Sequence, residues 1–374
     1  MAECSEAIAS AAASCKLGVI ATYPITPQTH IVEKLAKMHS EGKLNAEVIN
    51  VESEHSAMSA CIGAEACGVR TFTASSSQGI ALMSEMLFIA SGMRLPIVMA
   101  VANRAVSSPI NIWNDHSDTM AQRDSGWLQI YCESSQEAYD SIIQAYKIAE
   151  QKNVMLPVMV CVDGFTLSHL WEPMEEIKQG DIDSFLPAYN PINKLDTDNP
   201  KTLGALAYPN TYMQFKKQQQ DAMANSLEAI KKSNIEFGKK FNRTYGDGLV
   251  ETYRIDDAKE AIVAMGSVCS TARIVIDKLR QQGRKIGMIK IRAFRPFPSE
   301  AIKKIACNID KLAVIDRAVS LGSLGPLFLE IKAALPATRM NNFIVGLGGR
   351  DINENIIGNI IKKIGQKQEV EWIF

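Results

Sequence analysis

The sequence predicts an α/β protein in which a doubly wound, mostly parallel sheet is followed by a smaller α/β domain. Up to about residue 165, short β-rich runs alternate with stretches of helix length, as in a parallel sheet covered by helices on both faces. These runs are nearly continuous in apolar residues, which is typical of strands buried on both sides. The same alternation resumes from Glu260.

The strands expected in the first unit are Gly18–Thr22, Glu47–Val51, Arg70–Ala74, Pro96–Ala102 and Pro157–Val162. Ligands of parallel sheets bind beyond the carboxyl ends of the strands. We therefore expect functional side chains in the loops that follow the runs, which are residues 23–29, 52–56, 75–79 and 103–123.

The rest of the chain divides into an arm and a second domain. Residues 171–249 have scattered prolines and one strongly polar helical segment, Tyr212 to Phe241, and are interpreted as a connecting arm that makes subunit contacts. In residues 250–374, strands are expected at 261–266, 285–291, 311–316 and 341–346, with helices from Cys269, from Ser299, near Gly325 to Leu335 and from Asn353. The expected division is thus 1–170, 171–249 and 250–374.

Composition excludes several classes of protein. The 374 residues include 40 basic and 41 acidic side chains, and this balance offers no electrostatic excess for nucleic acid or an anionic membrane. The longest apolar stretch is interrupted by Glu85 and Arg94, and the start does not resemble a signal peptide. We therefore expect a cytoplasmic protein without a membrane anchor.

Cysteine and histidine usage argues against a metal centre. The eight cysteines show no C-x-x-C spacing, so neither a zinc site nor an iron–sulfur cluster is expected, and most of the thiols should be reduced and buried. His169 is the last of five histidines. Any chemistry should therefore lie in the first 170 residues.

The loop Tyr23-Pro24-Ile25-Thr26-Pro27 directly follows a predicted strand. Its two prolines restrict the backbone and could hold the Thr26 hydroxyl over a site. The alternative is a capped turn that leads into a helix from Gln28.

The second loop, Val51-Glu52-Ser53-Glu54-His55-Ser56-Ala57, opens a helix rich in small residues. A carboxylate at a helix start is commonly only a cap or a partner of the helix dipole. Two carboxylates that bracket a serine, Glu52 and Glu54, nevertheless form a candidate acid/base site.

The turn from Ser75 to Gly79 could offer backbone N–H groups to an anion, although an ordinary N-cap by one of its serines is favoured. The sequence has no P-loop signature, and Gly346-Leu347-Gly348-Gly349 lacks the third glycine of the dinucleotide fingerprint because residue 351 is Asp. A conventional NAD-dependent enzyme or ATPase is thereby disfavoured.

The long segment from Asn103 to Arg123 is also expected to be functional. Arg104, at the end of a strand, could grip a carboxylate, or it could form a structural ion pair with Asp115 or Asp118. His116 lacks a second His or Cys nearby, so a metal-ligand role is disfavoured.

Together these motifs resemble one family: YPITP at Tyr23, VESEHSA at Val51, FTASSSQG at Phe72, NR at Asn103, NIWNDHSDTMAQRDSGW at Asn111 and GLGGRD at Gly346. The chain is similar to the alpha subunits of the 2-oxoacid:ferredoxin oxidoreductases, most nearly those of the pyruvate branch. The resemblance spans essentially the whole chain and implies a thiamine-diphosphate-type fold, with a pyrimidine-side domain and a transketolase-like C-terminal domain.

The resemblance implies the CoA-dependent, reversible conversion of pyruvate into acetyl-CoA and CO2, with electrons passed to ferredoxin. Thiamine diphosphate would be shared with a partner chain, and partner chains would hold Mg²⁺ and the [4Fe-4S] clusters. The alternatives are the same chemistry on a branched 2-oxoacid such as 2-oxoisovalerate, or a non-catalytic assembly subunit.

The resemblance also assigns roles to residues. Glu54 matches the cofactor-activating glutamate, with Glu52 as the alternative. Arg104 matches the arginine that faces the substrate carboxylate, and Thr26 the substrate-binding threonine. Further cofactor contacts are expected from Pro24, Ile25, Ser77 and Gln78. The pocket wall is expected to include Asn111, Asn114 and Asp115.

Overall fold

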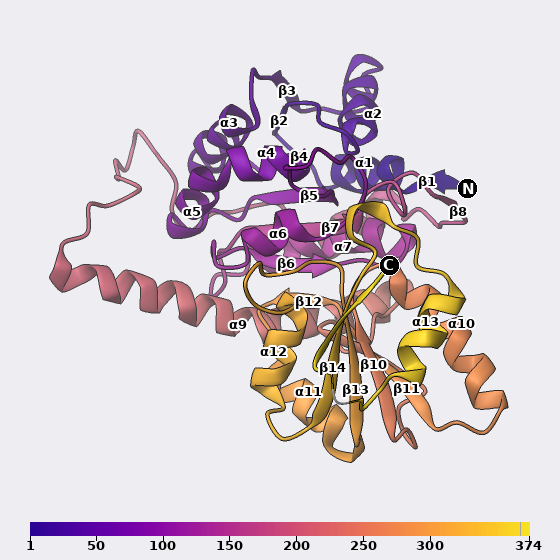
Figure 1. Cartoon of the computed structure of the whole chain (residues 1–374). Helices are drawn as coiled ribbons and strands as arrows, with labels where there is room; N and C mark the ends of the chain where they lie inside the picture. Colours follow the sequence, from indigo (N-terminus) through magenta and orange to yellow (C-terminus); the bar gives the residue numbers. More distant parts are fainter. Residues whose placement is uncertain (367) are drawn as a thin grey trace.

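The computed structural model describes residues 1–366 and 368–374, which form two sheets with helices packed on their faces (Figure 1). This arrangement confirms the predicted fold class. Among the described residues, no helix combines the length and the apolar character needed to cross a membrane.

The first sheet has seven strands in the order β12-β6-β7-β5-β4-β2-β3, and all neighbours pair in parallel except β12 and β6. The central strands are fully buried, whereas β3 is a largely exposed edge strand. The bounds are β2 Val19–Thr22, β3 Glu47–Asn50, β4 Thr71–Ser75, β5 Val98–Asn103, β6 Leu128–Tyr131, β7 Val158–Asp163 and β12 Ala293–Arg295. The five strands predicted in this unit are all present, and the short β6 and β12 were not foreseen.

Helices of the first unit cover both faces of this sheet. Helix α3 packs on β2 and β4, as its small residues allow, and α1 packs between α2 and α7. The bounds are α1 Cys4–Ser14, α2 Thr29–Ser40, α3 Glu54–Ala66, α4 Ser77–Leu82, α5 Ser84–Gly92, α6 Ser117–Ala121 and α7 Ser135–Ala149. A two-stranded pair, β1 Ala2–Glu3 and β8 Trp171–Glu172, closes the unit.

The arm consists of α8 Gln179–Phe185 and the long helix α9 Pro209–Phe241. Helix α9 begins three residues before the expected start at Tyr212. From Ala222 onward the helix buries Ala222, Ile230 and Phe237 against the body, whereas its N-terminal turns project from the molecule (Figure 1). This asymmetry explains why the sequence pattern of the helix is so polar.

The C-terminal sheet has the order β15-β14-β13-β10-β11-β9, parallel except for β9. Its bounds are β9 Val250–Tyr253, β10 Glu260–Ala264, β11 Ile286–Ile291, β13 Lys311–Asp316, β14 Arg339–Val345 and β15 Val370–Ile373, with helices α10 Val268–Gln281, α11 Ser299–Ile305, α12 Pro326–Ala334 and α13 Glu354–Lys362. The edge strands β9 and β15 were not predicted. Because β12 lies in the first sheet, residues 293–295 cross the expected boundary between the two units.

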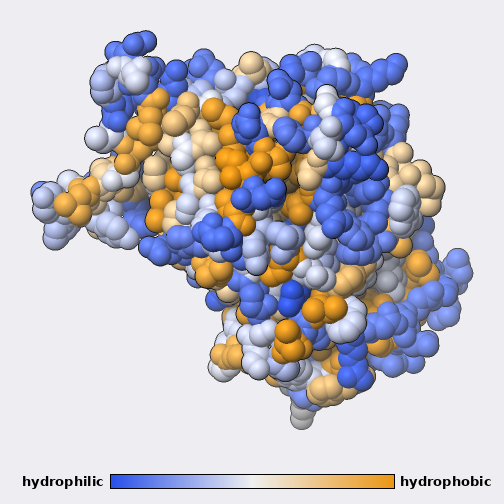
Figure 2. Space-filling model, turned by 90° about the horizontal axis from the view of Figure 1, so that it is seen from above, coloured by the Kyte–Doolittle hydropathy of each residue, from blue (hydrophilic) through white to orange (hydrophobic). Residues whose placement is uncertain are grey.

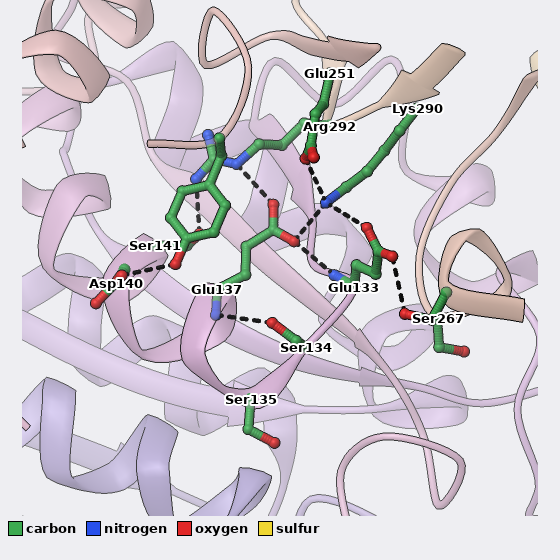
Figure 3. Close-up of polar contacts among 12 residues, drawn as sticks. Glu133, Ser134, Ser135, Glu137, Asp140, Ser141, Glu251, Ser267, Lys290 and Arg292 are labelled. Carbon is green, nitrogen blue, oxygen red and sulfur yellow. Dashed lines mark hydrogen bonds and ion pairs between the residues drawn. The ribbon is translucent and has the colours of Figure 1, made fainter. Parts of the chain in front are cut away.

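A buried ionic cluster joins the two units (Figure 3). Glu137 of α7 accepts from Lys290 Nζ at 2.7 Å and from Arg292 Nε at 2.9 Å, and all three side chains are almost completely buried. Glu133 and Glu251 also pair with Lys290. Burial alone would lower the pKa of Lys290, but the charges of the glutamates raise it, so Lys290 stays charged.

Candidate active site

The polar loops predicted to be functional meet at one edge of the first sheet. Strands β2, β4 and β5 are neighbours in parallel order, so the loops after their carboxyl ends lie side by side. These loops carry Thr26, Ser77 and Arg104.

Glu54 lies in the first turn of α3, whose N-terminus is capped by Ser53 Oγ accepting from Ser56 N at 3.2 Å. Its side chain is buried, at 6% exposure, and no described residue makes a hydrogen bond or ion pair with its carboxylate. Glu52 is exposed, and a hydrogen bond from Ser56 Oγ lowers its pKa. The buried, unpaired Glu54 is therefore the better acid/base candidate.

Gly79 packs directly against the Glu54 carboxylate. A Cβ built on Gly79 would lie 2.6 Å from Glu54 Oε1 and would also collide with Ser75 Oγ. The hydroxyls of Thr73, Ser75 and Ser76 are buried without a partner among the described residues. A carboxylate and orphaned hydroxyls next to an obligatory glycine fit a polar heteroaromatic ring such as an aminopyrimidine.

The favoured N-cap interpretation of the Ser75–Gly79 turn is wrong. Ser76 occupies the N-cap position of α4, but its hydroxyl makes no capping bond. The first amide is instead held by a side chain from outside the turn, because Ser77 N donates to Asp118 Oδ2 at 3.0 Å. Ser77 has a φ of +47°, a strained conformation for a non-glycine residue. Its Oγ lies 2.5 Å from both Ala105 O and Gln78 Oε1, and its single O–H can donate to either oxygen.

Two nitrogens of the Arg104 guanidinium donate hydrogen bonds to the protein, and the third nitrogen is free. Its Nε donates to Asn111 O and its Nη1 to Thr26 O, each at 2.9 Å, whereas Nη2 has no partner among the described residues. No ion pair joins the guanidinium to Asp115 or Asp118 in the described part of the chain, so the structural alternative for Arg104 is not observed. Desolvation lowers the pKa of Arg104, but a guanidinium stays charged at neutral pH.

The remaining predicted residues divide by exposure. Thr26 and Pro24 are exposed and Ile25 is half-buried, on the loop between β2 and α2. Helix α2 begins at Thr29 rather than Gln28, and Gln28 makes no side-chain cap. Asn114 is fully buried with both side-chain amide atoms unpartnered among the described residues.

Asp118 is a site residue whose importance was missed. Its Oδ2 accepts from Ser77 N and Arg104 N, both at 3.0 Å, and its Oδ1 accepts from Asn103 Nδ2 at 2.8 Å. One buried carboxylate thus ties together the ends of β4 and β5. Burial raises the pKa of Asp118 to about 6. The sequence offered only a faint signal, an acidic residue in a long loop.

His116 forms part of a second buried cluster rather than a metal site. Its Nε2 lies 2.7 Å from Asp163 Oδ1, and Arg317 Nη1 donates to Asp163 Oδ2 at 2.8 Å. Although burial acts to raise the pKa of Asp163, the charges of Arg317 and His116 hold it well below its usual range. This cluster connects the pocket loop to the C-terminal sheet.

Three potential metal ligands gather at Glu3, His30 and His169, with donor atoms within 4.8 Å of one another. Tetrahedral zinc requires donor atoms about 3.4 Å apart, given metal–nitrogen bonds of roughly 2.1 Å. Glu3 Oε1 and His30 Nδ1 already pair at 2.7 Å. The group is therefore explained as a hydrogen bond between Glu3 and His30 beside the tilted ring of His169.

Apolar side chains are exposed near the site. Figure 2 views the molecule from the side on which α2 and α3 lie and shows an apolar patch on this face. Exposed apolar residues of the neighbouring elements are Ile49, Leu82, Phe88 and Ile89. A contiguous exposed patch of this kind is typical of a protein–protein contact.

Comparison with known families agrees with this geometry. The family model described as "Pyruvate flavodoxin/ferredoxin oxidoreductase, thiamine diP-bdg" matches residues 10–234. The chain belongs to the pyruvate flavodoxin/ferredoxin oxidoreductase family. A second model, "Pyruvate:ferredoxin oxidoreductase core domain II", matches residues 258–357. The resemblance seen in the motifs is thereby confirmed.

Several relatives within this oxidoreductase family align over nearly the full chain. The pyruvate synthase subunit PorA of Methanocaldococcus jannaschii is 54% identical over 98% of this chain and 94% of its own length. PorA of Methanothermobacter thermautotrophicus is 50% identical over 99% and 96%. The ketoisovalerate oxidoreductase subunit VorA of Pyrococcus horikoshii is 44% identical over 98% and 95%.

Two solved structures share the fold seen in this family member. The 2-oxoglutarate:ferredoxin oxidoreductase of Magnetococcus marinus, solved with 2-oxoglutarate, coenzyme A and succinyl-CoA, has a TM-score of 0.72 and 18% identity. The match covers 97% of this chain and 64% of that one. A split-gene transketolase, an inactive beta4 tetramer, has a TM-score of 0.56 and 11% identity over 98% and 99% of the two chains.

Proposed function

We propose that this chain is the catalytic alpha subunit of a pyruvate:ferredoxin oxidoreductase, which oxidises pyruvate with coenzyme A to acetyl-CoA and CO2 and passes the electrons to ferredoxin. The observation that carries the proposal is the guanidinium of Arg104, which is fixed to Asn111 and Thr26 and still has Nη2 free for a substrate carboxylate.

Glu54 is the proposed cofactor-side residue. Thiamine diphosphate, when bound, supplies the carbon nucleophile that attacks the 2-oxo group and accepts the electrons of the broken C–C bond. The Glu54 carboxylate, buried and without a protein partner, would hold a proton at N1′ of the aminopyrimidine. Gly79 lets the turn approach the Glu54 carboxylate closely, and Ser77 and Gln78 on the same turn would add further contacts to the cofactor.

Arg104 and Thr26 are the proposed substrate-side residues. Nη2 of Arg104 would bind one carboxylate oxygen of the 2-oxoacid, and the exposed Thr26 hydroxyl would donate to the substrate from the neighbouring loop. One free guanidinium nitrogen suits a monoanion. Asn111, Asn114 and Asp115 would wall the pocket.

The substrate proposed is pyruvate rather than a branched 2-oxoacid. The PorA relatives of this chain are 46% to 54% identical to it, whereas the VorA relatives are 44% and 45% identical. The test is to purify the whole complex and to compare the CoA-dependent reduction of ferredoxin by pyruvate and by 2-oxoisovalerate. A higher kcat/KM for 2-oxoisovalerate would overturn the choice of pyruvate, and turnover of neither acid would support a non-catalytic assembly subunit.

Partner chains are proposed to complete the enzyme. The sequence lacks a recognisable diphosphate motif and cluster-type cysteine spacing. Mg²⁺, the diphosphate contacts and the [4Fe-4S] clusters are therefore assigned to other polypeptides, which would dock on the apolar patch of Ile49, Leu82, Phe88 and Ile89. The isolated chain should bind thiamine diphosphate weakly in calorimetry and show no iron–sulfur absorption. Tight, Mg²⁺-dependent binding by the chain alone would contradict this division of labour.

A further inference from the structure

A glycine-rich turn of the C-terminal domain holds the outer side of the substrate-pocket loop. The glycine turn comprises residues 346–350 between β14 and α13, and the substrate loop comprises residues 107–118 of the first unit. We propose that the glycine turn positions Arg104 for the substrate carboxylate, acting through Asn111. This inference rests on the role proposed above for Arg104.

Three hydrogen bonds join the turn to the loop. Gly349 N donates to Asn114 O at 2.6 Å, Asn111 Nδ2 donates to Gly348 O at 3.1 Å, and Gly348 N donates to Asp115 Oδ2 at 3.4 Å. The partners include all three residues expected to line the pocket. These hydrogen bonds from the C-terminal domain therefore hold the substrate loop in its position.

The hydrogen bonds from the glycine turn continue through Asn111 to the guanidinium of Arg104. The side chain of Asn111 donates to Gly348 O of the glycine turn, and the main-chain oxygen of Asn111 accepts from Arg104 Nε at 2.9 Å. Asn111 is held in place further by Trp113 N, which donates to Asn111 Oδ1 at 2.7 Å. A displacement of the turn would thus reach Arg104 through a single residue.

The glycine turn requires glycine for two reasons, its backbone conformation and its close contact with the substrate loop. Gly346, Gly348 and Gly349 all have positive φ values, between 61° and 79°, which only glycine adopts without strain. A Cβ on Gly348 would lie 2.6 Å from Asn111 Nδ2, and one on Gly349 would collide with Cβ of Trp113. Glycine is required here because the loop approaches so closely.

The loop and the C-terminal sheet also share the Asp163 cluster. His116 N donates to Arg317 O at 2.8 Å, just beyond the end of β13, and the side chains of His116 and Arg317 both pair with Asp163. The substrate loop is therefore attached to the C-terminal domain at two points, Asn114 and His116.

The matched test compares two glycines of the same domain. Gly349 and Gly322 have φ values of +79° and +81°, but a Cβ on Gly322 would meet no atom within 4 Å. Both Gly349→Ala and Gly322→Ala introduce the same backbone strain, and only Gly349→Ala pushes on the substrate loop. In the purified complex, Gly349→Ala should raise KM for pyruvate at least about tenfold, the range expected for loss of a well-oriented charged contact.

Two further measurements separate positioning from general damage. Gly349→Ala should accelerate amide hydrogen exchange in residues 107–118, and it should leave proton exchange at C2 of bound thiamine diphosphate without pyruvate unchanged. Gly322→Ala should change neither. If Gly349→Ala does not assemble, the deciding variant is Asn111→Ala. It removes the bond to Gly348 O, together with the bond from Trp113 N, without backbone strain and should also raise KM for pyruvate.

Three results would overturn the inference: equal KM changes in Gly349→Ala and Gly322→Ala, a loosened loop with unchanged KM, or an unaltered KM in Asn111→Ala. Failure of the proposed function is distinguishable, because the unmodified complex would then not oxidise pyruvate at all.

Discussion

Arg104 Nη1 donates to the main-chain oxygen of Thr26 at 2.9 Å, joining the loops after β5 and β2. The two residues are 78 positions apart in the chain and meet because their strands are near neighbours in the sheet. The bond uses the backbone of Thr26, so its hydroxyl remains free. Both proposed substrate contacts are thus held together without consuming the groups that would touch substrate.

The first prediction concerns Glu54. Glu54→Gln removes the carboxylate proposed to hold the proton at N1′ and should slow both proton exchange at C2 of the bound cofactor and turnover by at least about a hundredfold. The exposed Glu52 provides the matched control, because Glu52→Gln changes charge equally on the same loop. Both variants can be compared in the assembled complex by NMR-detected exchange and by ferredoxin reduction. Near-normal turnover of Glu54→Gln would show that Glu54 is misassigned.

The second prediction compares the two substrate contacts. Lysine at position 104 cannot bond to Asn111 O, Thr26 O and substrate in the same fork geometry. Arg104→Lys should therefore lower kcat/KM for pyruvate by about 10- to 150-fold, corresponding to about 1.5–3 kcal/mol for a charged hydrogen bond. Thr26→Val should lower it by about 2- to 10-fold, for a neutral bond. Equal, small losses in steady-state kinetics would place the substrate elsewhere.

The third prediction concerns Asp118. An asparagine presents one acceptor atom where the carboxylate presents two, so Asp118→Asn must lose either the bonds from Ser77 N and Arg104 N or those from Asn103 Nδ2 and Thr119 N. Either loss loosens the connection between the ends of β4 and β5. KM for pyruvate should rise by about tenfold or more. The exposed Asp124 is a control, since Asp124→Asn removes a charge from the same segment without touching either strand.

The same carboxylate should give the reaction an acid limb. Burial raises the pKa of Asp118 to about 6, so as the pH falls through about 6 the group gains a proton and loses acceptor capacity. KM for pyruvate should rise as the pH drops from 7 toward 5, and this rise should be absent in Asp118→Asn. A flat profile in the unmodified enzyme would contradict the role of Asp118.

The fourth prediction concerns the cluster between the two units (Figure 3). Glu137→Gln leaves Arg292 and Lys290 buried with less compensating charge. The free energy of unfolding of the chain should fall by about 3–5 kcal/mol, as is typical when one partner of a buried ion pair is lost. Glu300→Gln, which breaks an exposed pair with Lys303, should have no measurable effect in the same denaturant titration.

Local patterns were sufficient to predict most of the fold. The central strands of both sheets are short apolar runs buried on both faces, and such runs carry their own signal in the sequence. The short or half-exposed strands β6, β9, β12 and β15 lacked this signal. Strand β12 in particular exists only because residues 293–295 reach the edge of the first sheet.

The candidate site shows a similar division. The motifs of the sequence singled out Glu54, Arg104 and Thr26, because proline-rich and acidic loops after strands stand out in one dimension. They could not separate Asp118 from Asp115, since the sequence does not show which backbone and side-chain donors each carboxylate meets. Nor could they show that Gly348 contacts Asn111, 237 positions away. The sequence determined which residues stand at the ends of the strands, and the tertiary structure decided which of them touch, because contacts between distant loops depend on strand order and on the packing of the two units.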